Sequence, residues 1–225
     1  MRKEIQFLLC AENAWLLGEG MLGPLLVVFS QKVGGDLLDI AWLWSTYLIL
    51  TGLLIILVGM VSDRVDKTRL LFAGFALNTA MTFAYVLVDS PGELLLLQAG
   101  LAVAAGLATP TWDSLFSQYH DPHRSGYMWG LHSGQAHIVG GVAVVLGGLI
   151  VSAISFTALF VIMGSLQVFS TLCLIPLVGA SRAKRDKLGG KPLKAIRRLP
   201  GEMRSLFQEK TMSQERLRRD VSIIP

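Results

Sequence analysis

Long apolar segments recur through the first 180 residues, and they constrain the fold more than any other feature of the sequence. A helix needs about 20 mainly apolar residues to cross a lipid bilayer. Six segments meet this requirement, at residues 7–30, 40–61, 70–88, 94–116, 128–152 and 156–178. We therefore predict an all-α membrane protein with six transmembrane helices embedded in a lipid bilayer.

The breaks between these segments carry turn and charge signals. Residues 89–92 (Asp-Ser-Pro-Gly) separate the third and fourth segments, and a polar stretch at residues 118–126 separates the fourth and fifth. Residues 128–178 are apolar almost throughout, which is too long for one span. We therefore predict a hairpin there, with a tight turn at residues 152–155.

Composition and charge divide the chain into two parts. Only 16% of the residues are charged, against about 25% in an average soluble protein. Residues 1–179 carry 7 Lys or Arg and 11 Asp or Glu, whereas residues 180–225 carry 13 and 5. We predict a six-helix transmembrane domain at residues 1–180 and a cytoplasmic basic tail, amphipathic or disordered, at residues 181–225. Since the basic charge belongs to this tail and no nucleic-acid motif is recognisable, we expect no nucleic-acid partner.

Basic residues also predict the orientation. With six spans, 19 of the 20 Lys and Arg residues fall on the same side as the two termini, and Lys32 falls on the other. Cytoplasmic loops carry the excess of Lys and Arg. We therefore predict that both termini are cytoplasmic and that, in a prokaryote, the protein lies in the inner membrane. Aromatic residues near segment ends, including Tyr47 and Trp112, are typical of the membrane interface.

The loop between the second and third segments carries a family signature. It reads Gly-Met-Val-Ser-Asp-Arg-Val-Asp-Lys-Thr-Arg-Leu over residues 59–70. This resembles the Gly-x-Leu-Ala-Asp-Arg-x-Gly-Arg-Arg loop of the major facilitator superfamily, which lies between the second and third helices of its members. Gly59, Asp63 and Arg64 match the signature, whereas Asp66 replaces its second glycine.

The resemblance implies a particular architecture. Members usually have twelve helices in two six-helix halves, and residues 1–180 correspond to the first half, built from two three-helix repeats. The transport path of a member runs between its halves. The resemblance therefore implies a half-size transporter that works by alternating access, as a homodimer or with a second six-helix half. Two antiporter features are missing, namely an arginine before Gln98 and a Gly-Pro step in the fifth segment.

The resemblance also implies a cytoplasmic gate loop made of Gly59, Asp63, Arg64, Lys67 and Asp113. In the family, the acid that corresponds to Asp63 bonds to a helix end of the other half. We expect Arg64 to pair with Asp113, so that these ties hold the cytoplasmic side closed. The alternative is that these charges lie in a solvated turn and serve only to orient the chain.

Ionisable side chains within the predicted spans are candidates for function, because they are costly to place in a membrane. Glu12 and Glu19 are seven residues apart, which puts them on one helix face about 10 Å apart along the axis. The predicted pathway for substrate or protons comprises Glu12, Asn13, Glu19, Asn78, Gln98, His132 and Gln135. His137 points to another side of the fifth segment. Each of these side chains has the alternative role of a hydrogen bond between helices.

Two further patterns concern helix packing. We expect Cys10 and Cys173 to be buried thiols that pack as small hydrophobic residues. Glycines form a smooth face on the fifth segment, suited to packing within the chain or to a dimer seam. They are Gly130, Gly134, Gly140, Gly141, Gly147 and Gly148.

The sequence favours transport of a small solute over catalysis. We recognise no nucleophile–base pair, metal-binding cluster or phosphate-binding glycine loop. We therefore expect neither an enzyme nor a cofactor or metal. The substrate, which is a small molecule or an ion, and the coupling ion are left open. The alternatives are a non-transporting membrane scaffold and a truncated half of a split transporter.

Overall fold

The structure, a computed structural model, describes residues 3–62 and 65–181. The chain divides into a unit from Met1 to Val178 and a second unit from Gly179 to Pro225, and the fold below is that of the first unit. Asp63 and Arg64 lie outside the described residues. Apart from Ser181, so does the predicted basic tail.

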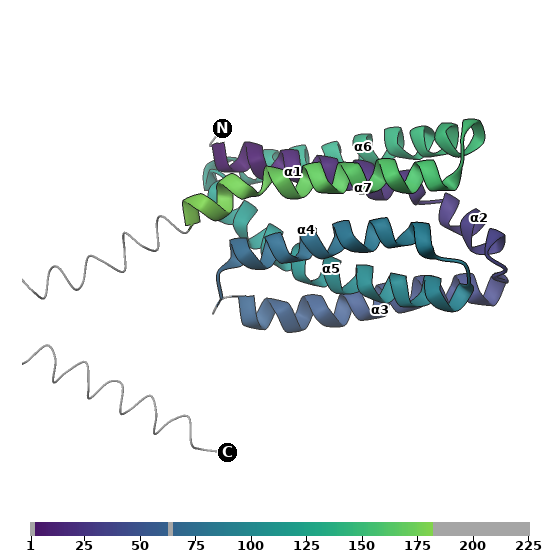
Figure 1. Cartoon of the computed structure of the whole chain (residues 1–225). Coiled ribbons are helices and arrows are strands. Elements are labelled where there is room, and N and C mark those ends of the chain that lie inside the picture. The colour runs from purple at the N-terminus through teal and green to yellow at the C-terminus, as the bar shows by residue number, and fades with distance from the viewer. Residues whose placement is uncertain (1–2, 63–64, 182–225) are drawn as a thin grey trace, which may run out of the picture. The chain divides into compact units, whose positions relative to one another are not determined.

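The described residues form an all-helical bundle, which confirms that the fold is all-α (Figure 1). Five segments are long and apolar enough to cross a membrane, and a bent helix pair at the start of the chain brings the count up to six. The helices are α1 (Lys3–Leu22), α2 (Leu25–Lys32), α3 (Leu37–Ser62), α4 (Lys67–Ala84), α5 (Pro91–Tyr119), α6 (Ser125–Ala153) and α7 (Phe156–Cys173).

The first predicted span is broken rather than continuous. Residues 7–30 were expected to form one helix, but α1 ends at Leu22 and α2 begins at Leu25, with a bend of 51° between them. Pro24 stands just before α2, and proline has no N–H to continue a helical ladder. The backbone N–H of Leu26 instead bonds to the carbonyl of Gly23, at 3.2 Å.

Side-chain caps explain where several helices begin. At the start of α3, Asp36 and Asp39 each accept a hydrogen bond from the other's backbone N–H, at 2.8 and 2.9 Å. Ser90 and Ser155 cap α5 and α7 in the same general way. Asp66, the residue that departs from the family signature, caps α4. The departure therefore has a structural role, since glycine has no side chain to bond the free N–H groups.

The helices pack as two groups of three. In one group α1 contacts α6 and α7, in the other α5 contacts α3 and α4, and α4 and α7 join the groups (Figure 1). The most apolar stretch of α5 is 56% buried, whereas those of α3 and α6 are only 6% and 11% buried. The outer faces of α3 and α6 are therefore apolar and largely uncovered by the rest of the bundle.

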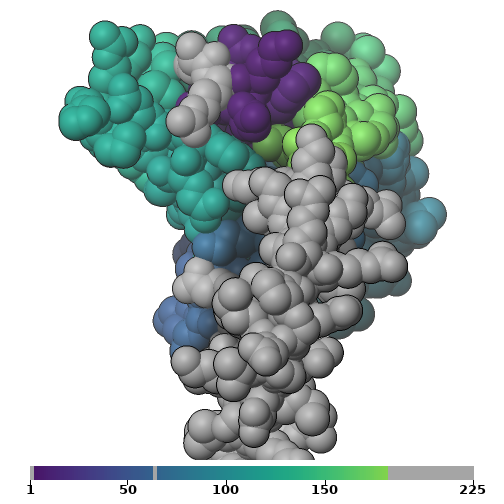
Figure 2. Space-filling view, turned by 90° about the vertical axis from the view of Figure 1, so that its left-hand side faces the viewer, coloured from purple at the N-terminus to yellow at the C-terminus, as the bar shows by residue number. Residues whose placement is uncertain are grey.

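Two apolar clusters fill the two ends of the bundle. Near the α6–α7 turn, Phe29 packs against Tyr85 and Phe160, with ring centroids 6.2 and 4.8 Å away. At the other end, Phe116 lies in a cluster with Leu8 and Met128. Figure 2 views this second end, where the start of α1, the α5–α6 connection and the end of α7 lie next to one another.

Small residues allow two close helix contacts. A Cβ at Gly147 of α6 would overlap the backbone of Met21 in α1, and a Cβ at Gly106 of α5 would overlap Leu54 of α3. Gly147 therefore serves packing within the chain. Gly148, one residue further on, has open space where a Cβ would be, as do four other glycines of the predicted face, at positions 130, 134, 140 and 141.

The two cysteines come together, although not as expected. The sulfur atoms of Cys10 and Cys173 are 3.6 Å apart, which joins α1 to the end of α7. Cys173 is half-buried, but Cys10 is exposed. The prediction of a buried thiol is therefore wrong for Cys10, because this position on α1 faces away from the core.

Candidate functional site

The first candidate site is a pocket of about 240 Å³ between the two groups of helices. Glu12 and Trp15 line it from α1, and Tyr47 lines it from α3. Thr109 and Asp113 of α5 and His132 of α6 complete its polar lining. The pocket therefore brings together two predicted pathway residues, Glu12 and His132, with one predicted gate residue, Asp113.

Glu12 and His132 are bonded to each other. Nδ1 of His132 lies 2.9 Å from a carboxylate oxygen of Glu12. The two side chains are 17% and 18% exposed, so water competes weakly for the bond. The ring of Trp112 lies against the imidazole, with centroids 4.4 Å apart. This arrangement fixes the carboxylate at one wall of the pocket and supplies a partner with which it can share a proton.

A second pocket of about 220 Å³ lies further along the same helices. Glu19 and Gln98, both predicted pathway residues, line it from α1 and α5. Tyr47 lines both pockets. The two carboxylates that were predicted to share a face of α1 therefore line adjoining pockets.

Glu19 has a partner of its own. The side-chain amide of Asn78 in α4 donates a hydrogen bond to the Glu19 carboxylate, at 2.9 Å. Asn78 is only 1% exposed, so it supports the carboxylate from within the bundle rather than from the pocket. Asn78 therefore bridges α4 and α1, and its place in a pathway remains a prediction.

A polar layer between α1, α4 and α7 surrounds this bond. Gln167 donates to the backbone carbonyl of Trp15 at 3.2 Å, and Ser170 donates to that of Ala11 at 2.6 Å. The hydroxyls of Thr79 and Thr171 are 3.0 Å apart. These bonds tie α7 to its neighbours, as polar side chains often do between membrane helices.

Three other candidates lie off the pockets. The side chains of Asn13 and Gln135 are half-buried, and neither lines the two pockets. Their amide oxygens are buried and have no hydrogen-bond partner in the part of the chain that the structure describes. His137 is exposed and bonds to the carbonyl of Ser133.

The predicted gate loop is described only in part. The ammonium group of Lys67 donates to the hydroxyl of Ser114 in α5, at 2.6 Å, next to Asp113. Gly59 accepts a hydrogen bond from the Ser62 hydroxyl at 3.0 Å. The expected pair between Arg64 and Asp113 and the role of Asp63 involve residues outside the described ranges.

Sequence reasoning missed the aromatic lining of the first pocket. Tyr47 and Trp112 were assigned to the membrane interface, but Tyr47 lines both pockets and Trp112 is only 5% exposed. Trp15 lies three residues after Glu12, a spacing that puts both on one side of a helix. That spacing was the available signal for Trp15.

A comparison with known families decides the identity of this bundle. The sequence profile described as Major Facilitator Superfamily matches residues 9–220, which is most of the chain. The chain belongs to the Major Facilitator Superfamily. It is therefore an integral, multi-pass membrane protein, as the predicted spans and the family resemblance indicated.

One curated relative of this superfamily member is an uncharacterized MFS-type transporter of Methanocaldococcus jannaschii. The two sequences are 20% identical over 157 residues. The match covers 70% of this chain and 41% of the relative, so the chain corresponds to less than half of that transporter's length.

Proposed function

We propose that the protein carries a small solute across the membrane by alternating access, along the face of the bundle that holds the two pockets. The observation that carries this proposal is that ionisable side chains of membrane-spanning helices line both pockets. Glu12 and His132 line the first pocket, and Glu19 lines the second. Ionisable groups at such positions are costly and mark substrate or ion pathways. Membership of the superfamily supports the same function.

The helix contacts support an internal repeat. The contact of α1 with α6 corresponds to that of α5 with α3, and the contact of α1 with α7 corresponds to that of α5 with α4. The fifth extensive contact joins α4 to α7, which are themselves equivalent in this scheme. This is the pattern of two three-helix repeats, with α1 and α2 together as one of six spans. Alternating access in such folds is a rocking of repeated units around a fixed site.

The bundle forms only one wall of the proposed transport path, and a second wall of protein must face it. Asp113 is exposed on α5, well before the end of the helix, and Glu12 and His132 line the same pocket. A polar cavity of this kind is unstable against hydrocarbon, because lipid offers no hydrogen bonds. We propose that a second copy of the chain covers it, with α3 of one protomer facing α6 of the other. The alternative cover is a different six-helix chain.

Access to the first pocket from each side of the membrane tests the transport proposal. In a chain with Cys10→Ser and Cys173→Ser, Thr109→Cys places a thiol in the pocket. Alternating access predicts that a membrane-impermeant maleimide labels this thiol in both right-side-out and inside-out vesicles. Thr79→Cys, between α4 and α7, is the control and should react from neither side. Labelling of position 109 from one side at most would support a static scaffold.

The mass of the purified protein, measured by light scattering with correction for bound detergent, tests the second wall. We expect two chains per particle. Co-expressed chains with Ile138→Cys and Ile49→Cys, in the same background, should then cross-link between α6 and α3, since both positions are exposed. A single chain per particle with no cross-link would contradict the homodimer.

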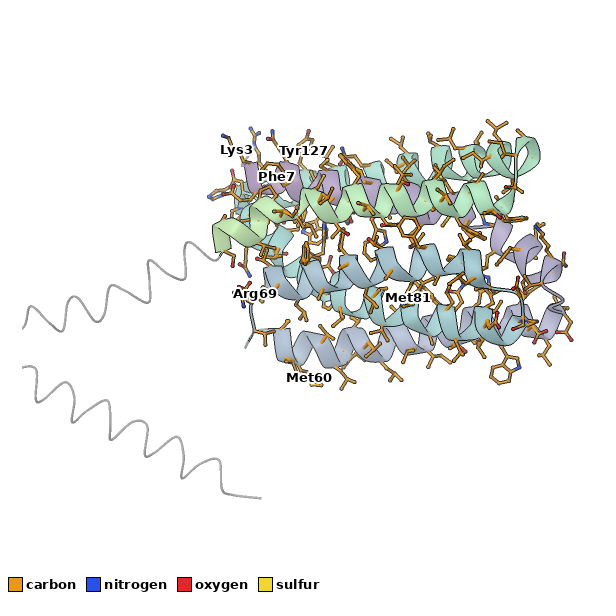
Figure 3. All side chains as sticks on the ribbon, viewed as in Figure 1. Lys3, Phe7, Met60, Arg69, Met81 and Tyr127 are labelled. Atoms are coloured by element: carbon orange, nitrogen blue, oxygen red, sulfur yellow. The ribbon has the colours of Figure 1, made fainter. Side chains whose placement is uncertain are left out.

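The orientation and the gate loop complete the proposal. Lys3 and Arg69 lie at the same end of the bundle, which supports a cytoplasmic location for that end (Figure 3). We expect Gly92→Cys to be labelled from outside intact cells and Asp121→Cys only after lysis. At the cytoplasmic end, Lys67→Met should speed labelling of Thr109→Cys from that side, because the bond to Ser114 holds the loop to α5.

A further inference from the structure

Carboxyl groups outnumber basic groups in the lining of the first pocket. Glu12 and Asp113 supply two carboxylates, and His132 is the one basic side chain among the described residues that line it. Neither Lys nor Arg is among those residues. A bound cation would have two carboxyl groups that can ionise against it, whereas an anion would find neither Lys nor Arg, so the lining favours a positively charged solute.

The remaining walls are largely aromatic. Trp15 packs edge-to-face on Phe75, with centroids 4.3 Å apart, and both line the pocket. Tyr47 and Trp112 line it from α3 and α5. Aromatic faces attract organic cations, and quaternary ammonium groups are recognised by such walls.

The acidic groups are not arranged for a metal ion. In the described ranges, 3–62 and 65–181, no three His, Cys, Asp or Glu side chains converge on a point where they could hold one. An organic cation is larger than a metal ion, so it can contact carboxyl groups and aromatic rings that lie apart from one another. The cavity of about 240 Å³ is smaller than the pockets of about 300–1,000 Å³ that hold drug-sized ligands. It therefore suits a small organic cation.

Building on the proposed transport function, we propose that the solute is a small organic cation of the ammonium class. Its charged group lies between Glu12 and Asp113, and its apolar part lies against Trp15 and Tyr47. His132 acts as a positioning residue, because it holds the Glu12 carboxylate at the wall while the pocket is empty.

The test is equilibrium binding to the full chain in nanodiscs, measured by titration calorimetry at low ionic strength. The probe is benzyltrimethylammonium. Neopentylbenzene has the same shape without the charge, and benzylsulfonate has a similar size with the opposite charge. We expect saturable binding of the cation and at least about tenfold weaker binding of the other two compounds, since one paired charge is worth tenfold or more.

Three variants locate the site. Glu12→Gln should weaken cation binding by at least about tenfold. Asp113→Asn should do so as well, and it keeps the proposal testable if the first variant does not fold, because Asp113 is exposed. Glu93→Gln is the matched control at the start of α5, outside both pockets, and should bind like the wild type.

Each outcome decides the proposal. Equal binding of all three compounds, tighter binding of benzylsulfonate, or unchanged affinity of both pocket variants would overturn the cation assignment. Binding at equilibrium needs no transport. Cation binding to a protein whose pocket is labelled from one side only would therefore refute alternating access and keep the cation site. Labelling from both sides without cation binding would support alternating access and refute the cation site.

Discussion

Nδ1 of His132 lies 2.9 Å from the carboxylate of Glu12, although the two residues are 120 positions apart in the chain. The bond joins the first transmembrane segment, α1, to α6 at the wall of the first pocket. A second carboxylate of α1, Glu19, is bonded to α4. One helix therefore presents two acids along the proposed path, and each is held by a different partner helix.

The Glu12–His132 bond should contribute measurably to stability. We expect a double-mutant cycle with Glu12→Gln and His132→Ala to give a coupling free energy of about 0.5–3 kcal/mol, the range for side chains in one hydrogen-bonded pair. The measurement is thermal unfolding of the detergent-solubilised protein. Additive effects of the two substitutions would show that the bond does not form in the membrane protein.

Asn78 should matter more for stability than Asn13. Asn78→Ala removes the amide that bonds to Glu19 and leaves the carboxylate without this donor, at a cost of about 1–3 kcal/mol. The amide oxygen of Asn13 has no partner among the described residues, so Asn13→Ala should cost less. Equal losses in the melting temperature of the two variants would contradict the assigned bond.

Neighbouring glycines of α6 should respond differently to the same substitution. Gly147→Ala places a methyl group against the backbone of Met21, and overpacking of this kind costs about 1–3 kcal/mol. Gly148→Ala meets open space and should change the stability of a single chain by less than about 0.5 kcal/mol. Melting temperatures of the detergent-solubilised protein test this contrast, and a reversed order would contradict the α1–α6 contact.

Cys10 and Cys173 should cross-link within one chain. Their sulfur atoms are 3.6 Å apart, so oxidation by copper phenanthroline should join α1 to α7. The measurement is the loss of two maleimide-reactive thiols per chain without a change in oligomeric mass. Cys10→Ser should leave one reactive thiol. Two freely reactive thiols after oxidation would contradict the packing of α1 on α7.

Helix positions were predictable because apolar length and turn residues report directly on membrane spans. The turn at residues 152–155 was found in this way, and α6 indeed ends at Ala153 and α7 begins at Phe156. The bend at Pro24 was missed because its flanks are as apolar as a continuous span. Sequence hydropathy does not record the loss of a backbone hydrogen bond.

Partners within the site were less predictable than its members. Glu12, Glu19 and His132 stood out because ionisable residues in apolar segments are rare. Their pairing depends on how α1, α4 and α6 pack, which no local pattern encodes. Tyr47 and Trp112 were assigned to the membrane–water interface. Aromatic residues are common both there and in pockets, so the sequence does not distinguish the two locations. Asp113 was assigned to the gate, and its position in the lining of the first pocket was not foreseen.

Counterflow of labelled benzyltrimethylammonium into proteoliposomes tests the central claim most directly, namely that solute crosses along the face of Glu12 and Glu19. Vesicles preloaded with the unlabelled cation should accumulate the labelled cation when they contain the wild-type chain. Vesicles with Glu12→Gln should accumulate at least about tenfold less, because the cation then meets no charge at that wall. Equal counterflow through the wild-type and Glu12→Gln chains would contradict the account.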